Sequence, residues 1–491
     1  MSTDQPDVKV AIVGSGFSGL GLAVRLKQAG MHDFTILERA GDLGGTWRDN
    51  SYPGCRCDVP SHLYSFSFAP NPEWSETYSP QPEIWDYLRK VAAEHQLDRH
   101  IRYGHDVTGA HWDDEAQLWR LKTAADELSA RVVVLGVGAL ADPKIPPIPG
   151  LEDFGGEVFH SAGWHHDYDL TGKRVAVVGT GASAIQFVPE IQPAVDKLVL
   201  FQRTAAWVLP HTNRGISAAE RWVYRHVPVA QRLNRLGVYV SRELLVFGLA
   251  FWPNAMKLGE RLARAHLARQ VPDRALRRTL TPDFRLGCKR IMLSNGYYPA
   301  LSKPNVEVVP SGITEVRGNT VVGADGSEHE VDAIIFGTGF HVTDPPYADT
   351  VYGRDGRSLA EVFDGSPRAY LGTTLPNFPN AFTLLGPNTG LGHTSVVFMI
   401  EGQIDYVMGS LRAMARRGWR SIEVRPSVER AYNAELQRKL PGTVWNSGGC
   451  ASWYLDANGV NSTIWPRFTW QFRLRTRRFR PENYAVTPEP R

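Results

Sequence analysis

A glycine-rich turn directly after an apolar run is the feature that most constrains how this chain folds. Residues 8–13 are largely apolar, and Gly14-Ser15-Gly16-Phe17-Ser18-Gly19 then opens a segment with helical spacing. In such a unit the first glycine makes the turn, the second lets the backbone approach a pyrophosphate, and the third lets helix and strand pack closely. The sequence therefore predicts a Rossmann-like dinucleotide-binding unit at the N-terminus.

An acidic residue ends the next predicted strand of this unit. Glu38 follows the apolar residues 34–37. A carboxylate at that place accepts hydrogen bonds from ribose hydroxyls. An N-terminal unit with an acidic residue is typical of FAD in chains that carry two nucleotide units, so we expect FAD here.

A second unit repeats the pattern further along the chain. Residues 175–178 form a predicted strand, residues 179–184 the turn with Gly179, Gly181 and Ala184, and residues 198–201 the next strand. Arg203 lies 24 residues after Gly179, as Glu38 lies 24 residues after Gly14, which predicts an acid and a base in the same slot. Because a guanidinium suits a 2′-phosphate, the second unit is expected to bind NADP(H) rather than NAD(H).

The nearly balanced charge gives no support for a nucleic-acid partner, so we expect none. The 491 residues include 54 Lys and Arg against 51 Asp and Glu. One basic run, Arg473 to Arg480, alternates at first with Phe472 and Leu474, which predicts a solvated or ion-paired strand.

Cysteine usage and the apolar segments bear on location. The four cysteines, at 55, 57, 288 and 450, show neither CxxC nor zinc spacing, so we expect free thiols, no metal site and a cytoplasmic protein. The polar, acidic start, residues 1–8, does not look like a signal peptide. The longest apolar run, residues 244–252, is too short for an integral membrane segment and is expected to be a buried or interfacial helix, with a monotopic contact left open.

The order of predicted elements gives the fold class. Buried strands at residues 132–138 and 332–340 each close a nucleotide unit, and the proline-rich residues 143–150 form an extended crossing. We therefore predict an α/β fold with two Rossmann-like dinucleotide-binding domains, for FAD and NADP, and a helical insertion. The expected division is 1–145 (FAD domain, first part), 146–212 (NADP domain, first part), 213–300 (mainly helical insertion), 301–375 (NADP domain, second part) and 376–491 (FAD domain, second part).

Two long motifs carry a resemblance to a known family. Between the two units stand Phe154, Gly156, His160 and Trp164, which match the F-x-G-x-x-x-H-x-x-x-W fingerprint of the type I Baeyer-Villiger monooxygenases. His165 departs from the proline or aspartate of that pattern. A second family pattern is matched by Gly44, Gly45, Trp47, Tyr52, Pro53, Gly54 and Asp58.

The resemblance implies roles for individual residues. Arg290 would be the catalytic arginine and Asp58 its orienting partner, whereas His160 would be a non-catalytic hinge residue. Lys289 would hold the 2′-phosphate together with Arg203 and Thr204. The cofactor-binding set implied in full is Gly14, Gly16, Gly19, Glu38, Thr46, Trp47, Asp58, Tyr64, Gly179, Gly181, Ala184, Arg203, Thr204 and Lys289.

The activity that the resemblance implies is oxygen insertion next to a ketone carbonyl. FAD, NADPH and O₂ would give an ester or lactone through a C4a-peroxyflavin, with sulfide oxidation as a side activity. Alternatives are an N- or S-oxygenating flavin monooxygenase and a non-oxygenating flavin reductase; Trp164 and the Asp58/Arg290 pair favour ketone oxidation. A substrate pocket is expected around Trp445, Trp453, Tyr454 and Trp465, and flavin contacts at the small-residue turn 388–393, while the ketone and the oligomeric state stay open.

Overall fold

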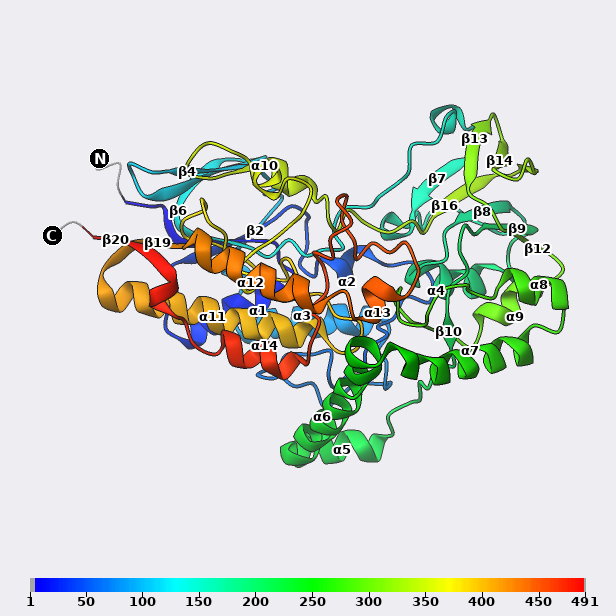
Figure 1. The fold of residues 1–491 in the computed structure, drawn as a ribbon, viewed down its shortest axis with the longest axis horizontal. Coiled ribbons are helices and arrows are strands. Elements are labelled where there is room, and N and C mark those ends of the chain that lie inside the picture. Colours follow the sequence, from blue (N-terminus) through cyan, green and yellow to red (C-terminus); the bar gives the residue numbers. More distant parts are fainter. Residues whose placement is uncertain (1–4, 490–491) are drawn as a thin grey trace.

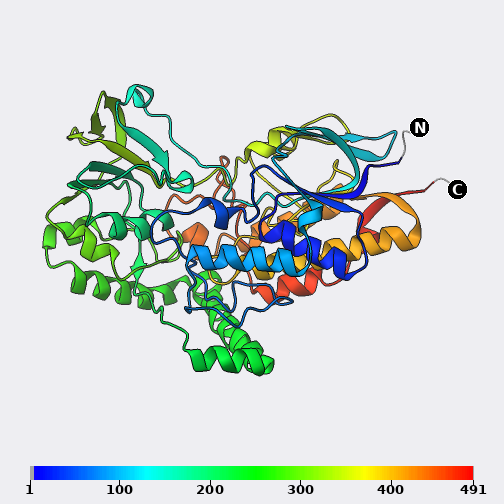
Figure 2. The same ribbon diagram turned by 180° about the vertical axis from the view of Figure 1, so that it is seen from behind.

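Two lobes, each built on a mainly parallel sheet, make up the computed structural model, which describes residues 5–489 (Figures 1 and 2). Both chain ends lie at the outer side of the first lobe. The first four residues of the acidic N-terminal segment lie outside the described residues.

The sheet of the first lobe has eight strands. Its parallel part places β1 (Val8–Val13) between β6 (Glu127–Leu135) and β2 (Phe34–Glu38), with β3 (Ile101–Tyr103) at the edge. The long strand β6 pairs with β1 on one side; on its other side its first half pairs with β5 antiparallel and its second half with β18 in parallel. The remaining strands are β4 (Val107–Asp113), β5 (Leu118–Thr123), β17 (Val351–Tyr352) and β18 (Ala381–Thr383).

Helices from both ends of the chain cover this sheet. The first helix, α1 (Phe17–Gln28), packs against α11 (Val396–Arg417), which the sequence predicted as an amphipathic helix. Apolar residues dominate both, so burying them against each other and the sheet stabilises the lobe. In Figure 1 the C-terminal helices α12 (Pro426–Lys439) and α14 (Thr469–Thr476) lie beside the N-terminal helices α1 and α3 (Gln81–Glu94).

The second lobe holds a five-stranded parallel sheet in the order β12-β9-β8-β16-β7. This lobe also has a separate three-stranded antiparallel sheet, β13-β14-β15, whereas the antiparallel strands β4 and β5 of the first lobe are part of its main sheet. The bounds are β7 (Glu157–His160), β8 (Arg174–Val178), β9 (Lys197–Phe201), β12 (Val306–Val309), β13 (Ile313–Arg317), β14 (Thr320–Gly323), β15 (Glu328–Glu330), β16 (Ala333–Phe336) and helix α4 (Ala182–Ile191). Two parallel sheets with helices confirm the predicted fold class.

The chain returns to the first sheet earlier than residue 376. Val351 and Tyr352 pair with Ala110 and His111 of β4. Helix α10 (Leu359–Phe363) then buries its apolar residues in the core beside this sheet.

The insertion is helical and comprises α5 (Ala218–His226), α6 (Pro228–Glu243), a π-helical turn η4 (Phe247–Phe251), α7 (Met256–Gln270), α8 (Arg274–Thr279) and α9 (Tyr297–Leu301). In Figure 1 its helices α5 and α6 project from the underside of the molecule, whereas α7, α8 and α9 lie along the second lobe. Among the described residues no single helix meets the length and composition needed to span a bilayer. The pair Pro228–Phe251 and Pro253–Gln270 meets them jointly, with a bend of 114° at the break.

The start of the basic run near the C-terminus belongs to a helix that ends at Thr476, so the predicted strand is wrong. Phe472 is buried and Leu474 is exposed, so the two side chains do not share one face as they would in a strand. The predicted ion pairing is confirmed: Arg473 pairs with Glu401, and Arg475 with Glu435. The remaining elements are α2 (Thr46–Asp49), β10 (Val208–Leu209), β11 (Met292–Leu293), α13 (Val444–Ser447), β19 (Trp419–Val424) and β20 (Tyr484–Pro488).

Candidate active site between two nucleotide units

The first glycine turn is too crowded for side chains. Gly14 adopts a φ of 97°, and a Cβ there would meet the Gly136 carbonyl oxygen at 2.8 Å. A Cβ on Gly19 would lie 1.9 Å from the Gly14 oxygen. A Cβ on Gly16 would meet the Gly45 Cα at 3.8 Å and the Gly44 carbonyl oxygen at 3.9 Å, which are ordinary contact distances, so the crowding is confined to Gly14 and Gly19. This cradle fits a pyrophosphate at the start of α1.

Glu38 ends β2 and is buried directly behind this turn. Its carboxylate accepts hydrogen bonds from the Ser15 backbone N–H at 3.0 Å and the Ser15 hydroxyl at 2.6 Å. The Ala40 N–H and the Arg48 guanidinium also donate to it. Burial opposes ionisation, but these hydrogen bonds and the Arg48 charge hold the pKa of Glu38 below its usual value, so the residue is an anion.

The second glycine turn repeats the first in its backbone contacts. Gly179 has a φ of 108°, and a Cβ there would meet the Gly337 oxygen at 2.6 Å. Gly337 donates to Val178 at 2.8 Å, just as Gly136 donates to Val13 at 2.8 Å. Ala184 takes the place of Gly19, so the second turn leaves room for a methyl group at this position of the helix.

The two charged residues do not occupy the same slot, contrary to the prediction. The Gly14 N–H donates to the Leu37 carbonyl, and the Gly179 N–H donates to the Phe201 carbonyl. Glu38 therefore corresponds to Gln202, because the second connection is one residue shorter, and Arg203 stands one position further out. The acid is buried, whereas the base is exposed.

Arg203, Thr204 and Lys289 line one cavity of about 350 Å³. Burial, together with the nearby Arg203 charge, lowers the pKa of Lys289. In the described part of the chain no salt bridge joins Arg203 or Lys289 to an acid. Asp283 also lines this cavity and acts electrostatically on Lys289, but the two cations outnumber this acid, so with the Thr204 hydroxyl the site fits a phosphate group.

Arg290 and Asp58 form a bidentate ion pair, as the sequence predicted from family resemblance. The Nε and Nη2 atoms of Arg290 donate to the two Asp58 oxygens at 2.6 and 2.5 Å. The side chains are 30% and 24% exposed. The Asp58 charge raises the pKa of Arg290 still further, and burial of Asp58 is outweighed by the Arg290 charge, so the pKa of Asp58 is lowered. Both groups are therefore ionised at neutral pH.

Tyr454 lies within electrostatic reach of this pair. Burial raises the pKa of Tyr454 to about 12, with smaller contributions from Arg290 and Asp58. Its buried hydroxyl has no hydrogen-bond partner among the described residues. Trp445 and Trp465 are buried too, whereas Trp453 is exposed, so the aromatic stretch does not form one pocket wall.

Gln186 attaches the segment that carries Asp58 to the second unit. Its side-chain oxygen accepts from the Tyr52 hydroxyl at 3.0 Å and from the Arg56 N–H at 3.2 Å. Its amide group donates to the Arg56 carbonyl at 3.0 Å. Gln186 lies on α4, and no motif pointed to it. Arg242 of α6 was missed in the same way, although its charge helps to lower the pKa of Asp58.

Thr46 and Trp47 begin α2 beside the first glycine turn. The Trp47 indole N–H donates to the Tyr64 hydroxyl at 3.1 Å, and the two rings meet edge to face. Trp47 also belongs to the larger apolar core and Tyr64 packs against it, so packing accounts for part of the role of these two residues.

Crowding explains the spacing of Phe154 and Gly156 in the linker motif. A Cβ on Gly156 would lie 2.3 Å from the Asp332 carbonyl oxygen and 2.6 Å from the Phe154 ring. Phe154 is buried in the core of the second lobe. A glycine is needed here because the linker passes close to the strand that follows Asp332.

His160 is buried at the end of β7. The Ala162 N–H donates to its Nδ1 at 3.1 Å, while Nε2 has no partner among the described residues. Burial lowers the pKa of His160 to about 4, against a smaller opposing effect of the Gly339 backbone. His160 is therefore neutral at physiological pH.

Trp164 and His165 pack around Phe159. Trp164 meets the Phe159 ring edge to face at 5.1 Å, and His165 stacks on it at 4.9 Å. The His165 Nδ1 also contacts the Glu157 carboxylate. The unmatched position of the motif thus has a structural partner of its own.

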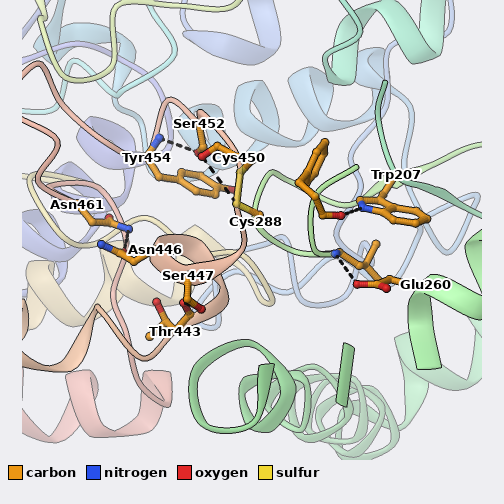
Figure 3. Close-up of a disulfide and its surroundings, with 12 residues drawn as sticks. Trp207, Glu260, Cys288, Thr443, Asn446, Ser447, Cys450, Ser452, Tyr454 and Asn461 are labelled. Carbon is orange, nitrogen blue, oxygen red and sulfur yellow. Dashed lines mark hydrogen bonds between the residues drawn. A yellow bond between two sulfur atoms is a disulfide. The ribbon is translucent and has the colours of Figure 1, made fainter. Parts of the chain in front are cut away.

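A disulfide joins Cys288 to Cys450, so the expectation of four free thiols is wrong (Figure 3). The two residues are 162 positions apart, which hides their proximity from the sequence. Cys55 and Cys57 are free and buried. The bridge adjoins Lys289 and ties the loop before Tyr454 to the segment that carries Arg290.

The small-residue turn 388–393 is held by the C-terminal segment rather than left open. Asn388 donates to the Asn461 and Ile464 carbonyls. His393 contacts Glu243 of α6 at 3.3 Å. Among the described residues no cluster of histidine, cysteine and acidic side chains could hold a metal ion.

Comparison with known proteins places these features in a family context. A family model described as "Flavin-binding monooxygenase-like" matches residues 7–357. Two Baeyer-Villiger monooxygenases are similar over nearly the whole chain. The one from Streptomyces coelicolor is 55% identical over 98% of this chain and 92% of its own, and the one from Pseudomonas aeruginosa is 52% identical over the same shares.

A solved structure agrees in fold. Cyclohexanone monooxygenase from Rhodococcus sp. Phi1, bound to NADP⁺, matches with a TM-score of 0.86 and 28% identity, over 98% of this chain and 99% of that one.

Proposed function

Because the chain belongs to the flavin-binding monooxygenase-like family and, within it, to the Baeyer-Villiger monooxygenases, we propose that it uses FAD, NADPH and O₂ to insert one oxygen atom beside the carbonyl of a small-molecule ketone. The product is an ester or lactone. The observation that carries the proposal is the bidentate Arg290–Asp58 pair, which keeps a permanent cation partly exposed between the two units.

The residues present fit the two cofactors. The turn of Gly14, Gly16 and Gly19 leaves backbone at the FAD pyrophosphate, and ionised Glu38 suits the adjoining ribose. Arg203, Thr204 and Lys289 suit the 2′-phosphate of NADPH. Reduced flavin supplies the oxygen chemistry and NADPH the electrons. Thr46, Trp47 and Tyr64 border the first site, and Gly179, Gly181 and Ala184 border the second.

Arg290 acts on the negative charge that develops on the ketone oxygen. A guanidinium keeps its charge at any working pH, and two of its donors are already directed by Asp58. Within residues 5–489 no hydrogen bond uses its Nη1 group, which can therefore donate to substrate. Such preorganised donors stabilise a developing oxyanion without reorganisation in the transition state.

Asp58 positions Arg290 rather than touching substrate. Without its carboxylate the guanidinium would lose both directing hydrogen bonds and its countercharge. His160, Phe154, Gly156 and Trp164 belong to the linker between the units, which we propose serves as the hinge that excludes water during turnover.

Substitution of Arg290 tests the proposal. We expect Arg290→Ala to reduce ester formation about 100- to 1000-fold while NADPH oxidation continues and yields hydrogen peroxide. Product mass spectrometry, run beside an NADPH absorbance assay, separates the two outcomes. A matched control is Arg285→Ala, because Arg285 is a nearby arginine paired with Glu260. Undiminished ester yield from Arg290→Ala would exclude the role.

The positioning role of Asp58 needs a graded series. We expect Asp58→Glu to retain more ester formation than Asp58→Ala, at equal flavin content, because only Glu can bond both guanidinium donors. If Asp58→Glu and Asp58→Ala are equally active, Asp58 does not orient Arg290.

We also infer the division of the chain and its location. We keep the expected division with one change: because β17 pairs with β4 and α10 packs beside the first sheet, residues 351–375 join 1–145 and 376–491 in the proposed FAD domain. The proposed NADP domain then comprises 146–212 and 301–350, and the insertion 213–300. A cytoplasmic location is proposed, and cell fractionation tests it.

A further inference from the structure

Helix α6 of the insertion exposes a row of apolar side chains to solvent. Val229, Leu233, Leu236, Val240 and Leu244 follow one another at helical spacing, and all are exposed; we call them the α6 stripe. Leu233 is 63% exposed and Val229 59%. A helix that served only the core would turn these residues inward.

The inward face of α6 carries polar and charged side chains instead. Gln231 donates to the Asn71 carbonyl at 2.6 Å, and Arg235 donates to the His62 carbonyl at 2.6 Å. Glu243 accepts from the Thr469 hydroxyl at 2.6 Å. Because hydrogen bonds hold this face to the first lobe, the helix cannot turn over to bury the stripe.

Apolar and aromatic side chains continue beyond both ends of the stripe. Trp222 of α5 is exposed before it, and Trp252 is exposed after it. Leu258 and Leu262, one turn apart on α7, are also exposed. Tryptophan is enriched where an apolar phase meets water, because its ring is apolar and its N–H is polar.

The insertion that carries the stripe is basic. Residues 218–279 contain twelve Lys and Arg against four Asp and Glu, whereas the whole chain carries a net charge of only +3. Arg232, Lys257 and Arg261 are exposed, and none of them forms a salt bridge within residues 5–489. An apolar face flanked by basic residues is the composition of helices that lie in an anionic lipid interface.

We propose that the α6 stripe docks on the surface of a membrane that contains anionic phospholipids. The contact is monotopic, because the hydrogen-bonded inward face keeps α6 attached to the first lobe. A second copy of the chain fits less well, since an isologous contact would bring two strongly basic surfaces together.

Vesicle flotation of the FAD-loaded protein tests the docking. We expect binding to vesicles of phosphatidylcholine mixed with phosphatidylglycerol, weaker binding to pure phosphatidylcholine, and release by salt. The triple variant Leu233→Gln, Leu236→Gln, Val240→Gln should bind about 10-fold more weakly. Leu474→Gln is the control, because Leu474 is similarly exposed on α14 and lies outside the insertion.

A second variant keeps the test independent of any folding defect. Arg232→Glu, Lys257→Glu and Arg261→Glu together should abolish the preference for phosphatidylglycerol while flavin content stays unchanged. Equal binding of wild type and both triple variants would overturn the proposal. So would wild type that ignores the vesicles but forms a dimer in light scattering that the apolar variant dissociates; that result would assign the stripe to a second copy.

Discussion

The two nucleotide units share one backbone plan and differ in where they place charge. In each, three neighbouring parallel strands end at the turn: β6-β1-β2 in the first unit and β16-β8-β9 in the second. In each, two glycine N–H groups donate to carbonyl groups of these strands. The first unit buries an acid, Glu38, behind the turn, and the second exposes a base, Arg203, beyond it. A ribose hydroxyl can be reached inside the fold, whereas a phosphate dianion is better met where water remains. We therefore propose that cofactor specificity depends on the burial of the charged residue as well as on the sign of its charge.

The largest expected effect comes from breaking the first turn. Gly19→Ala puts a methyl group 1.9 Å from the Gly14 oxygen, so backbone must move where FAD is held. We expect a loss of stability of more than about 3 kcal/mol and almost no bound flavin. The ratio of flavin to protein absorbance measures this.

The corresponding position of the second unit supplies the control. Ala184→Gly should cost only about 1 kcal/mol, the helical penalty of glycine, and leave FAD bound. If Gly19→Ala keeps its flavin as well, the close packing of the first turn is not required.

Loss of the exposed base should change cofactor choice rather than folding. We expect Arg203→Ala to raise the KM for NADPH about 10- to 100-fold and to leave the KM for NADH nearly unchanged, because only NADPH carries the phosphate. Steady-state kinetics with both cofactors measure the split. Arg317→Ala, an exposed arginine on β13, is the control; an equal loss for NADH would refute a phosphate role.

The disulfide lies at the proposed NADPH site, and among the described residues the first glycine turn has no such bridge. Cys450→Ser should lower the free energy of unfolding by about 2–4 kcal/mol and raise the KM for NADPH, since Cys450 and Lys289 line the same cavity. Thermal unfolding with and without reductant measures the bond. Reductant should shift the wild type and leave Cys450→Ser unmoved; an unshifted wild type would mean that the bridge contributes no stability.

The effect that is smallest at neutral pH involves His160, in the linker between the units. His160 has its pKa lowered to about 4 by burial, so the unfolded chain binds a proton that the folded chain does not between about pH 6.5 and 4. Stability therefore falls as pH drops through that window, by up to about 3 kcal/mol. His160→Gln should flatten this slope in denaturant titrations. Ser161→Ala, a buried neighbour that does not titrate, should keep it.

Local patterns were sufficient to predict the elements around each turn. The strands ending near Val13 and Val178 were expected from apolar runs followed by glycines, since short-range sterics determine such turns. The Arg290–Asp58 contact was expected only through family resemblance, because 232 positions separate the two residues.

Long-range contacts account for what the sequence did not reveal. The Cys288–Cys450 bridge, Gln186 and the early return of β17 depend on which distant segments meet, and no spacing encodes that. Phe472 and Leu474 were misread because alternation over a few residues suits a strand and a helix alike. The one-residue offset of Arg203 arose from a connection whose length is visible only once hydrogen bonds are known.

The hydrogen bonds of Gln186 have a mechanical consequence. They couple the Tyr52–Arg56 segment, and with it Asp58, to helix α4 of the opposite unit. If the lobes rotate relative to each other during turnover, acid and guanidinium will travel as one body, and the flavin will be the part that approaches or recedes. The geometry of the Asp58–Arg290 pair would then not depend on the hinge angle. The distance between this pair and the flavin would depend on that angle.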